Sequence, residues 1–323
     1  MSESGLFSYH LDYIWTTIDS LDIDYWRWVV WVIYPIIISF LLPLCILILF
    51  YASSIFLHVY HYRHSLQEAY THDFWDGARK TLAALWDAQG WIWHGFEIDG
   101  IERIPSEGPA LLIYYHGTLP VDFYYIVAKC LIEKNRHIRA VGDRFLFHIP
   151  GWRLLLEVMK VTPGTVQSCV SVLKDGHLLG IAPGCNIAHC GVREALFGDE
   201  LYPVMWGKRL GFSKVATEAN VPIIPIFTQN VREAFRTPSI TRNWLRWVYE
   251  KTRLPIVPIY GFFPVKLKSF VGEPIVPGQN EDPEDLAKRV QVSMQELIKC
   301  NQRLPGSILR ALVDRLDFLQ IQR

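Results

Sequence analysis

The sequence predicts an α/β fold, a largely parallel β-sheet flanked by helices, preceded by an N-terminal membrane-embedded helical segment. Short apolar runs alternate with longer helix-like stretches, at 110–115, 138–142, 178–182, 222–227 and 256–260. This alternation is typical of parallel strands joined by crossover helices. In addition, residues 29–60 contain no Asp, Glu, Lys or Arg, a composition that predicts a membrane segment.

The N-terminal part of the chain divides into three segments. Residues 1–28 form an acidic, aromatic leader, unlike the basic start of a signal peptide. Residues 29–60 are flanked by Trp residues on the N-terminal side and by Tyr residues on the C-terminal side, as at the two interfaces of a bilayer. Pro35 and Pro43 can each kink a helix, so a transmembrane span and a re-entrant hairpin both remain open. Residues 61–90 have the pattern of an amphipathic connecting helix.

Charge and cysteine content limit the class and location of the protein. Lys plus Arg and Asp plus Glu number 32 each, so the chain lacks the positive excess of a nucleic-acid-binding protein. Arg63, Arg79 and Lys80 follow the membrane segment, whereas only Arg27 precedes it, which favours a cytosolic location of the domain that follows. The six cysteines are scattered along the chain, and this fits a reducing compartment.

Residues 91–323 are expected to form one domain that ends in two helices. Asp282 and Pro283 can start the first of these, because Pro is favoured in the first turn of a helix. The second begins at about residue 306 and has Arg310 and Arg315 on its flanks. Its apolar residues are Ile308, Leu309, Leu312, Val313, Leu316 and Leu319. This last helix could lie on a membrane surface, but we expect it to pack on the domain.

A histidine follows the apolar run 110–115 and suggests a catalytic base. Pro120 can begin a helix, which places Asp122 in its first turn, close to His116. A carboxylate can hold one imidazole nitrogen and leave the other free to take a proton from a hydroxyl. The spacing alone is weak, because chance supplies ~0.5 such pairs in a chain of this composition. The structural alternative is that Asp122 opposes the helix dipole and His116 is a hydrogen-bonded core residue.

Two further strands end in polar or glycine-containing turns. The run 178–182 leads into Pro183-Gly184-Cys185-Asn186, and the run 222–227 leads into Thr228-Gln229-Asn230. If the strands are parallel, these turns share one edge of the sheet with His116, where ligands bind in open α/β sheets. The arrangement suits a reaction that needs a base and backbone donors for an oxyanion.

Cys185, His189 and Cys190 also raise the question of a metal site, because all three are zinc-type ligands. Adjacent His and Cys residues rarely serve one tetrahedral site, and no fourth ligand stands at a typical spacing. We therefore expect an exposed loop here and no bound metal.

Together these motifs resemble the glycerolipid acyltransferase superfamily, which has a His-x4-Asp motif followed by a proline–glycine acceptor loop. Phe96–Leu112 resembles the family's lead-in to its histidine, Asp143–Gly151 its second block and Val221–Phe227 its fourth. Gly191-Val-Arg-Glu-Ala-Leu resembles the Gly-Gly-x-x-Glu-Ala-Leu segment of the branch that acylates neutral acylglycerols. The resemblance covers roughly residues 91–275, with four blocks in the family's order.

The resemblance implies a reaction and a set of site residues. His116 would be the general base that deprotonates the acceptor hydroxyl, and Asp122 would orient its ring. Acyl-CoA would be the co-substrate, with no cofactor, and the enzyme would sit in the endoplasmic reticulum membrane, using the lipid bilayer and an acylglycerol as its partners. The residues implied in substrate binding are Gly117, Arg144, Pro183, Gly184, Arg193 and Glu194.

Two features of the chain differ from the family pattern. Five residues separate His116 from Asp122 instead of four, and residues 185–190 look like an insertion in the acceptor loop. No arginine follows Pro183-Gly184 directly, and because phosphate sites favour arginine we prefer a mono- or diacylglycerol acceptor. The first alternative function is that of a lysophosphatidate-type acyltransferase. The interrupted acceptor loop motivates a second alternative, a non-catalytic lipid-binding or scaffolding protein.

Overall fold

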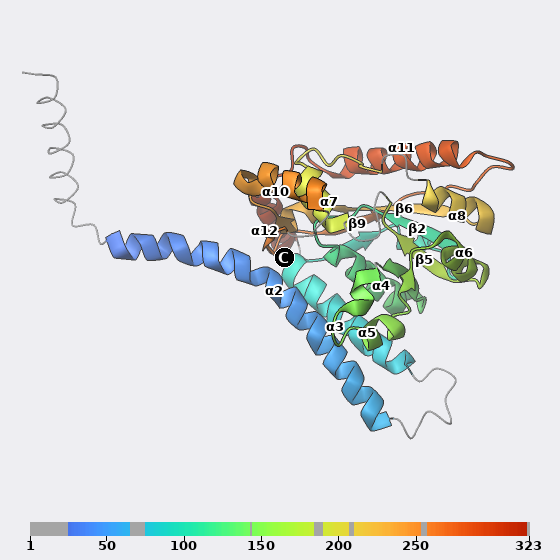
Figure 1. The fold of residues 1–323 in the computed structure, drawn as a ribbon, viewed down its shortest axis with the longest axis horizontal. Helices are drawn as coiled ribbons and strands as arrows, with labels where there is room; N and C mark the ends of the chain where they lie inside the picture. Colours follow the sequence, from blue (N-terminus) through green and yellow to red (C-terminus); the bar gives the residue numbers. More distant parts are fainter. Residues whose placement is uncertain are drawn as a thin grey trace, which may run out of the picture.

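The computed structural model describes residues 25–64, 75–142, 144–183, 190–206, 210–252 and 257–321 (Figure 1). Within them one seven-stranded sheet has the order β1-β9-β6-β2-β5-β3-β4. Its strands are β1 (Glu97–Asp99), β2 (Ala110–Tyr114), β3 (Ile138–Gly142), β4 (Thr162–Pro163), β5 (Leu178–Ile181), β6 (Ile223–Gln229) and β9 (Lys268–Val271). A separate pair consists of β7 (Phe235–Arg236) and β8 (Tyr260–Gly261).

The sheet is mostly parallel, which confirms the predicted fold class. Strand β2 lies at its centre, parallel to β5 on one side and to β6 on the other. Only the pairing of β6 with β9 is antiparallel. The predicted run 256–260 is the exception among the expected strands, because it contributes only the short β8, outside the main sheet.

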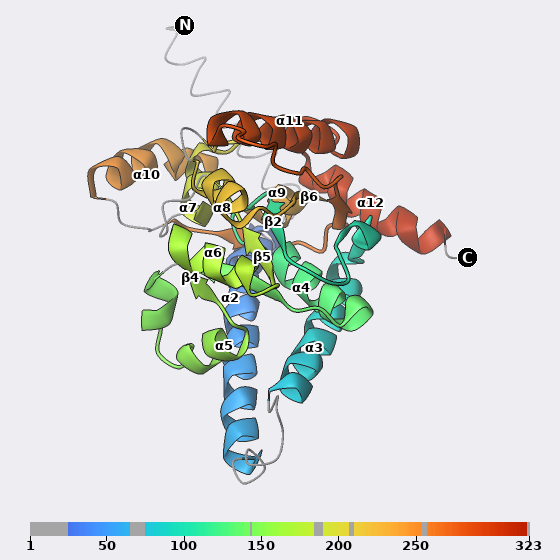
Figure 2. The ribbon, with the colours of Figure 1, turned by 90° about the vertical axis from the view of Figure 1, so that its right-hand side faces the viewer.

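Helices cover both faces of the sheet (Figure 2). They are α3 (Asp76–His94), α4 (Val121–Lys134), α5 (Arg153–Val158), α6 (Val166–Lys174), α7 (Cys190–Phe197), α8 (Gly211–Ala219), α9 (Val231–Ala234), α10 (Ser239–Thr252), α11 (Pro283–Asn301) and α12 (Ile308–Ile321). Alternate residues of β2 supply the two cores: Leu112 and Tyr114 pack on the side of α3 and α4, whereas Leu111, Ile113 and Tyr115 pack on the side of α6, α8 and α11.

Helix α4 forms where the sequence predicts it. Pro120 occupies its N-cap position, and Asp122 lies in the first turn, where a carboxylate opposes the helix dipole favourably. The helix ends at Asn135, whose left-handed backbone (φ 52°) is one that Asn tolerates better than most residues. The α4 start is therefore fixed directly after the exit of β2, and this places His116 and Asp122 in the same region of the fold.

Helix α2 (Tyr25–His64) is one continuous helix, not a re-entrant hairpin. It contains Pro35 and Pro43, and Figure 1 shows that it bends, its first half projecting from the domain and its second half running along it. Its stretch Trp26–Tyr60 is the one helix among the described residues that is long and apolar enough to cross a membrane.

The second half of α2 is part of the domain surface. Ile46 and Leu57 are buried, and the Ser54 hydroxyl donates to the carbonyl of Gly151. The outer face of this half is exposed and apolar along a helical stripe, Leu44, Leu47, Ile48, Tyr51, Ile55 and Val59. The helix therefore has two parts: its start, up to about residue 38, stands free (the free half), and the rest packs on the domain.

The remaining predicted helices can be compared with the described ones. The described parts of the predicted helix 61–90 are the last turn of α2 and most of α3, while residues 65–74 lie outside the described residues. Helices α11 and α12 begin close to the predicted residues. Helix α12 packs on the domain through Ala311, as expected, but Leu309, Val313 and Leu316 are exposed.

Candidate active site

Three strand exits meet at one edge of the sheet, as the sequence predicts. Because β2 lies between β5 and β6 and is parallel to both, His116, Pro183 and Asn230 all follow strands that end on the same side. This is the edge at which open α/β sheets bind ligands. The candidate site is therefore assembled from segments far apart in the chain.

His116 is half-buried at the exit of β2, beside the ring of Tyr114. Its Nδ1 lies 2.5 Å from the carbonyl oxygen of Gly117, so Nδ1 carries the proton and Nε2 keeps its lone pair. Burial lowers the pKa of His116 to about 4, and the Gly117 hydrogen bond only partly offsets this. The imidazole is therefore neutral at pH 7, with Nε2 as its basic atom.

Asp122 is fully buried in the first turn of α4. Burial raises the pKa of Asp122 to about 6, and the nearby Thr228 hydroxyl moderates the rise. Neither carboxylate oxygen has a hydrogen-bond partner of normal geometry among the described residues. An ionised carboxylate left in this way is costly to the stability of the fold.

The predicted hydrogen bond between His116 and Asp122 is not formed in this structure. The carbonyl of Gly117 occupies the Nδ1 position that the carboxylate would take, and Asp122 lies beside Thr228 of β6. Both side chains nevertheless lie on the same side of the sheet, since His116 continues the alternation of Leu112 and Tyr114 towards α4. The catalytic roles of the two residues stay a prediction.

Gly117 permits the chain to pass close to α9 after His116. A Cβ atom at this position would lie 3.0 Å from Val231 Cγ2 and 3.3 Å from its carbonyl oxygen. A side chain would therefore push the β2 exit away from the segment that follows β6. This is a packing reason for the glycine, which adds to its predicted place in the substrate site.

Behind the site lies a buried polar cluster that the sequence did not reveal. The Tyr115 hydroxyl donates to Glu194 Oε2 over 3.3 Å, and burial keeps the pKa of Tyr115 above its usual range. Arg232 Nη1 lies 2.5 Å from the same oxygen, and its Nη2 donates to the Glu194 carbonyl. Glu194 on α7 is thus joined to both neighbouring strand exits.

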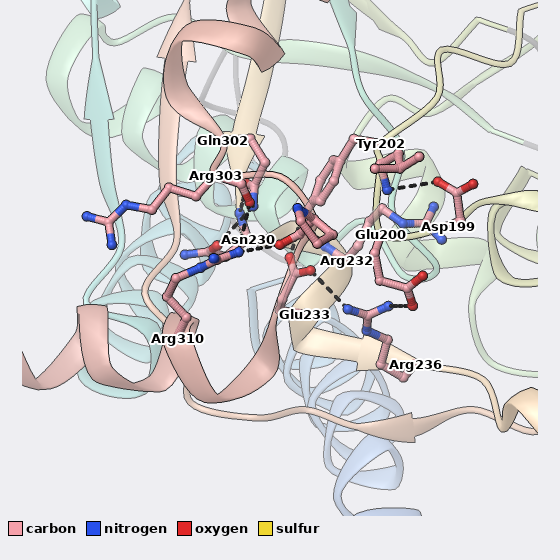
Figure 3. A network of polar contacts seen from close by, with 12 residues as sticks. Asp199, Glu200, Tyr202, Asn230, Arg232, Glu233, Arg236, Gln302, Arg303 and Arg310 are labelled. Atoms are coloured by element: carbon pink, nitrogen blue, oxygen red, sulfur yellow. Dashed lines mark hydrogen bonds and ion pairs between the residues drawn. The ribbon is translucent and has the colours of Figure 1, made fainter.

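Figure 3 shows how the cluster continues from Arg232. The Tyr202 hydroxyl accepts from the backbone N–H of Arg232 and donates to Glu233, whose other oxygen is 3.0 Å from Arg236 Nη2. Arg236 in turn pairs with Glu200 at 2.7 Å. The charged pair Arg232-Glu233, directly after an apolar strand, is the signal that could have indicated this cluster.

The structure describes some of the predicted substrate-binding residues and not others. Pro183 follows β5 and is half-buried, and Arg193 is half-buried on α7. Glu194 is buried against Arg232, a structural partnership that leaves its substrate role a prediction. Gly184 and the side chain of Arg144 lie outside the described residues, as do Cys185, His189 and the side chain of Cys190. Within the described chain no cluster of His, Cys, Asp and Glu could hold a metal ion.

A family model described as "Acyltransferase" matches residues 95–229, which include strands β2, β5 and β6 and the exits at His116 and Pro183. A Bos taurus protein named "DGAT1/2-independent enzyme synthesizing storage lipids" is 48% identical over 309 residues, 95% of this chain and 90% of its own length. The Homo sapiens protein of the same name is 48% identical over 303 residues, 93% of this chain and 91% of its own. The chain belongs to the acyltransferase family.

These relatives are of the transmembrane protein 68 type, and the predicted superfamily is therefore confirmed. The chain is an enzyme, a glycerolipid-type acyltransferase, and not a non-catalytic scaffold. Among solved structures, the 1-acyl-sn-glycerophosphate acyltransferase PlsC from Thermotoga maritima is 15% identical, with a TM-score of 0.45. That likeness covers 76% of this chain and 97% of the PlsC chain.

Proposed function

We propose that this acyltransferase moves a fatty acyl group from a thioester donor, acyl-CoA, to a hydroxyl of a mono- or diacylglycerol, with His116 as general base. The observation that carries the proposal is the state of His116: half-buried, neutral at pH 7, with Nε2 available at the edge where three strands end. A neutral imidazole in this position can accept the proton of an acceptor hydroxyl.

The reaction then needs no covalent acyl-enzyme. As Nε2 takes the hydroxyl proton, the acceptor oxygen attacks the thioester carbonyl and forms the new ester bond. The C–S bond breaks, and the thiolate that leaves takes the proton from the imidazolium. Asp122, ionised at neutral pH and on the same side of the sheet, would stabilise the imidazolium while it exists.

The charges at the site favour a neutral acceptor. The guanidinium groups of Arg232 and Arg236 are paired with Glu194, Glu233 and Glu200. A phosphate monoester is best held by a guanidinium that is not already neutralised. For a lysophosphatidate acceptor, the charge would have to come from one of the other predicted site arginines, Arg144 or Arg193. The names of the relatives, which refer to storage lipids, agree with the neutral acceptor.

The position of α2 supports delivery of the acceptor from a membrane. Phe50, in the second half of α2, packs edge-on against Tyr124 with ring centroids 5.0 Å apart. Tyr124 lies two residues after Asp122 and is close enough that, besides burial, the Asp122 charge raises its pKa. The helix that carries the membrane segment therefore contacts the first turn of the catalytic helix. A lipid that diffuses in the bilayer would arrive at this side of the site.

We also propose that the enzyme resides in the endoplasmic reticulum membrane with its catalytic domain in the cytosol. The excess of Arg63, Arg79 and Lys80 after the membrane segment over Arg27 before it supports the orientation. The organelle follows from the resemblance to glycerolipid acyltransferases. Protease accessibility of the catalytic domain in sealed microsomes tests the orientation.

Side-by-side acceptor assays test the reaction. The full chain in phospholipid vesicles is given radiolabelled acyl-CoA with monoacylglycerol, diacylglycerol or lysophosphatidate, and the products are separated by polarity. We expect label in di- or triacylglycerol that exceeds label in phosphatidate. Predominant labelling of phosphatidate would assign the protein to the lysophospholipid alternative, and absence of any labelled ester would contradict the acyl-CoA donor.

A further inference from the structure

Helix α12 has a second apolar face that does not contact the domain. Its inner face packs through Ala311, which is fully buried, and Leu312. Leu309, Val313 and Leu316 recur with the spacing of a helical stripe and are 76%, 52% and 59% exposed. A surface helix normally covers its apolar stripe with the core and presents polar residues outward. The outer stripe of α12 therefore requires a separate explanation.

Helix α10 likewise has one buried and one exposed apolar face, and tryptophans occupy the exposed face. Leu245 and Tyr249 pack against Leu196 of α7, whereas Trp244 and Trp247 point outward, 64% and 54% exposed. The ammonium of Lys251 lies 4.4 Å from the centroid of the Trp247 ring. Outward tryptophans with adjacent basic residues are typical of the region where a bilayer meets water.

Both helices lie at the end of the domain from which the free half of α2 leaves (Figure 1). Arg315 of α12 donates to the carbonyls of Trp91 and Ile92 at the end of α3, which holds α12 at this end of the domain. Phe40 of α2 packs against Tyr260 at 5.7 Å, close to the same place. Helices α10 and α12 thus lie at the same end of the domain as the start of the helix that carries the membrane segment.

The directions of the helices are also informative. The free half of α2 runs across Figure 1, and Figure 2 is viewed along that direction. In Figure 2, α10 and α12 both extend sideways, so they lie across the axis of the free half of α2. If the free half spans a bilayer, α10 and α12 lie parallel to its surface, the orientation of interfacial amphipathic helices.

We propose that Trp244, Trp247, Leu309, Val313 and Leu316 form a docking surface for the lipid bilayer, the second attachment of the domain besides α2. The inference rests on insertion of α2 and not on the proposed reaction. A lipid surface fits better than a second copy of the chain, because both helices lie at the end of the domain from which the membrane segment leaves, and because α10 combines tryptophan with lysine. Since α10 packs on α7, docking also supports the helix that carries Glu194.

Photo-cross-linking of the full chain in vesicles tests this docking surface. A photoreactive phenylalanine analogue replaces Leu309, Val313 or, as a control on α11 that is as exposed as Val313, Val292. With radiolabelled phosphatidylcholine, positions 309 and 313 should give a several-fold excess of lipid adduct over position 292. Adduct at the level of the control, or cross-links to a second copy of the chain, would overturn the proposal. No turnover is needed, so the outcome is independent of the proposed reaction.

A kinetic experiment gives a second readout. The variant with Leu309→Gln, Val313→Gln and Leu316→Gln should raise the KM for vesicle-borne diacylglycerol several-fold. Its kcat with detergent-dispersed acceptor should equal that of the wild type, which also shows that the variant is folded. Val292→Gln serves as the control and should change neither value. An unchanged KM in vesicles would contradict the docking surface.

Discussion

Arg232 and Glu194 form a buried ion pair in which Nη1 lies 2.5 Å from Oε2, and this pair joins the segment after β6 to helix α7. Both side chains are almost inaccessible to solvent, at 5% and 12% exposed. Tyr115, directly before His116, donates to the same carboxylate. The pair therefore connects all three strand exits, since α7 is the first helix after Pro183 among the described residues.

Replacing Arg232 by Met should strongly destabilise the protein. The change leaves the Glu194 carboxylate buried without its cation, which typically costs about 3–5 kcal/mol. Chemical denaturation of the solubilised full chain measures the free energy of unfolding. The double variant Arg232→Met with Glu194→Gln should recover part of the loss, because no buried charge then remains. Equal stability of the single variant and the wild type would show that the pair is not a structural element.

Asp122→Asn should abolish most activity and yet stabilise the fold at neutral pH. The folded pKa of about 6 lies above the ordinary value of 3.8, so wild-type stability falls as the pH rises from about 3.8 to about 6 and stays at the lower level above that. Removal of the buried charge should return about 1–3 kcal/mol at pH 7.5. Thermal unfolding at pH 7.5 and pH 5 provides the measurement. The stability gain of Asp122→Asn over the wild type should be smaller at pH 5. If the variant is less stable than the wild type at both pH values, the prediction is wrong.

The pH dependence of kcat/KM should reflect the ionisation of both His116 and Asp122. Activity requires Asp122 ionised and His116 neutral, and with pKa values of about 6 and about 4 the rate should fall as the pH drops through about 6. The residual activity of Asp122→Asn should lack this fall and decline only near pH 4. If the variant kept the wild-type decline near pH 6, the ionisation that controls activity would not be that of Asp122.

Gly117→Ala should lower activity and destabilise the protein by about 1–3 kcal/mol, because the new methyl group meets Val231 at 3.0 Å. The strain should displace the β2 exit and with it His116. Gly211→Ala is the matched control, since a Cβ there meets nothing within 4 Å. Thermal unfolding and acyl-transfer rates are measured for both variants. Equal stability and equal activity of the two variants would contradict the prediction.

The fold was predictable where the apolar runs are long and flanked by turn residues. Strands β2, β3, β5 and β6 belong to this group, and their parallel pairing followed from the helices between them. Strand β9 was not foreseen, because Lys268–Val271 is short and half polar. Its antiparallel pairing with β6 depends on tertiary contacts that no local pattern encodes.

The site was predictable to the level of its strand exits. His116 and Pro183 could be placed at one sheet edge because parallel strands end on the same side. The hydrogen bond of His116 to its own neighbour Gly117, in place of Asp122, depends on the detailed path of the turn and could not be read from spacing. The pairing of Glu194 with Arg232 joins residues 38 positions apart, and only the folded chain brings them together.

The central claim is that His116 is the general base of acyl transfer. His116→Gln removes the basic nitrogen and keeps a polar side chain of similar size. The matched control is His177→Gln, a half-buried histidine at the start of β5, on the opposite edge of the sheet. In vesicles with acyl-CoA and diacylglycerol, His116→Gln should lose at least about 100-fold in rate while His177→Gln stays near wild type. A His116→Gln enzyme that is folded and retains wild-type acyl transfer would contradict the account.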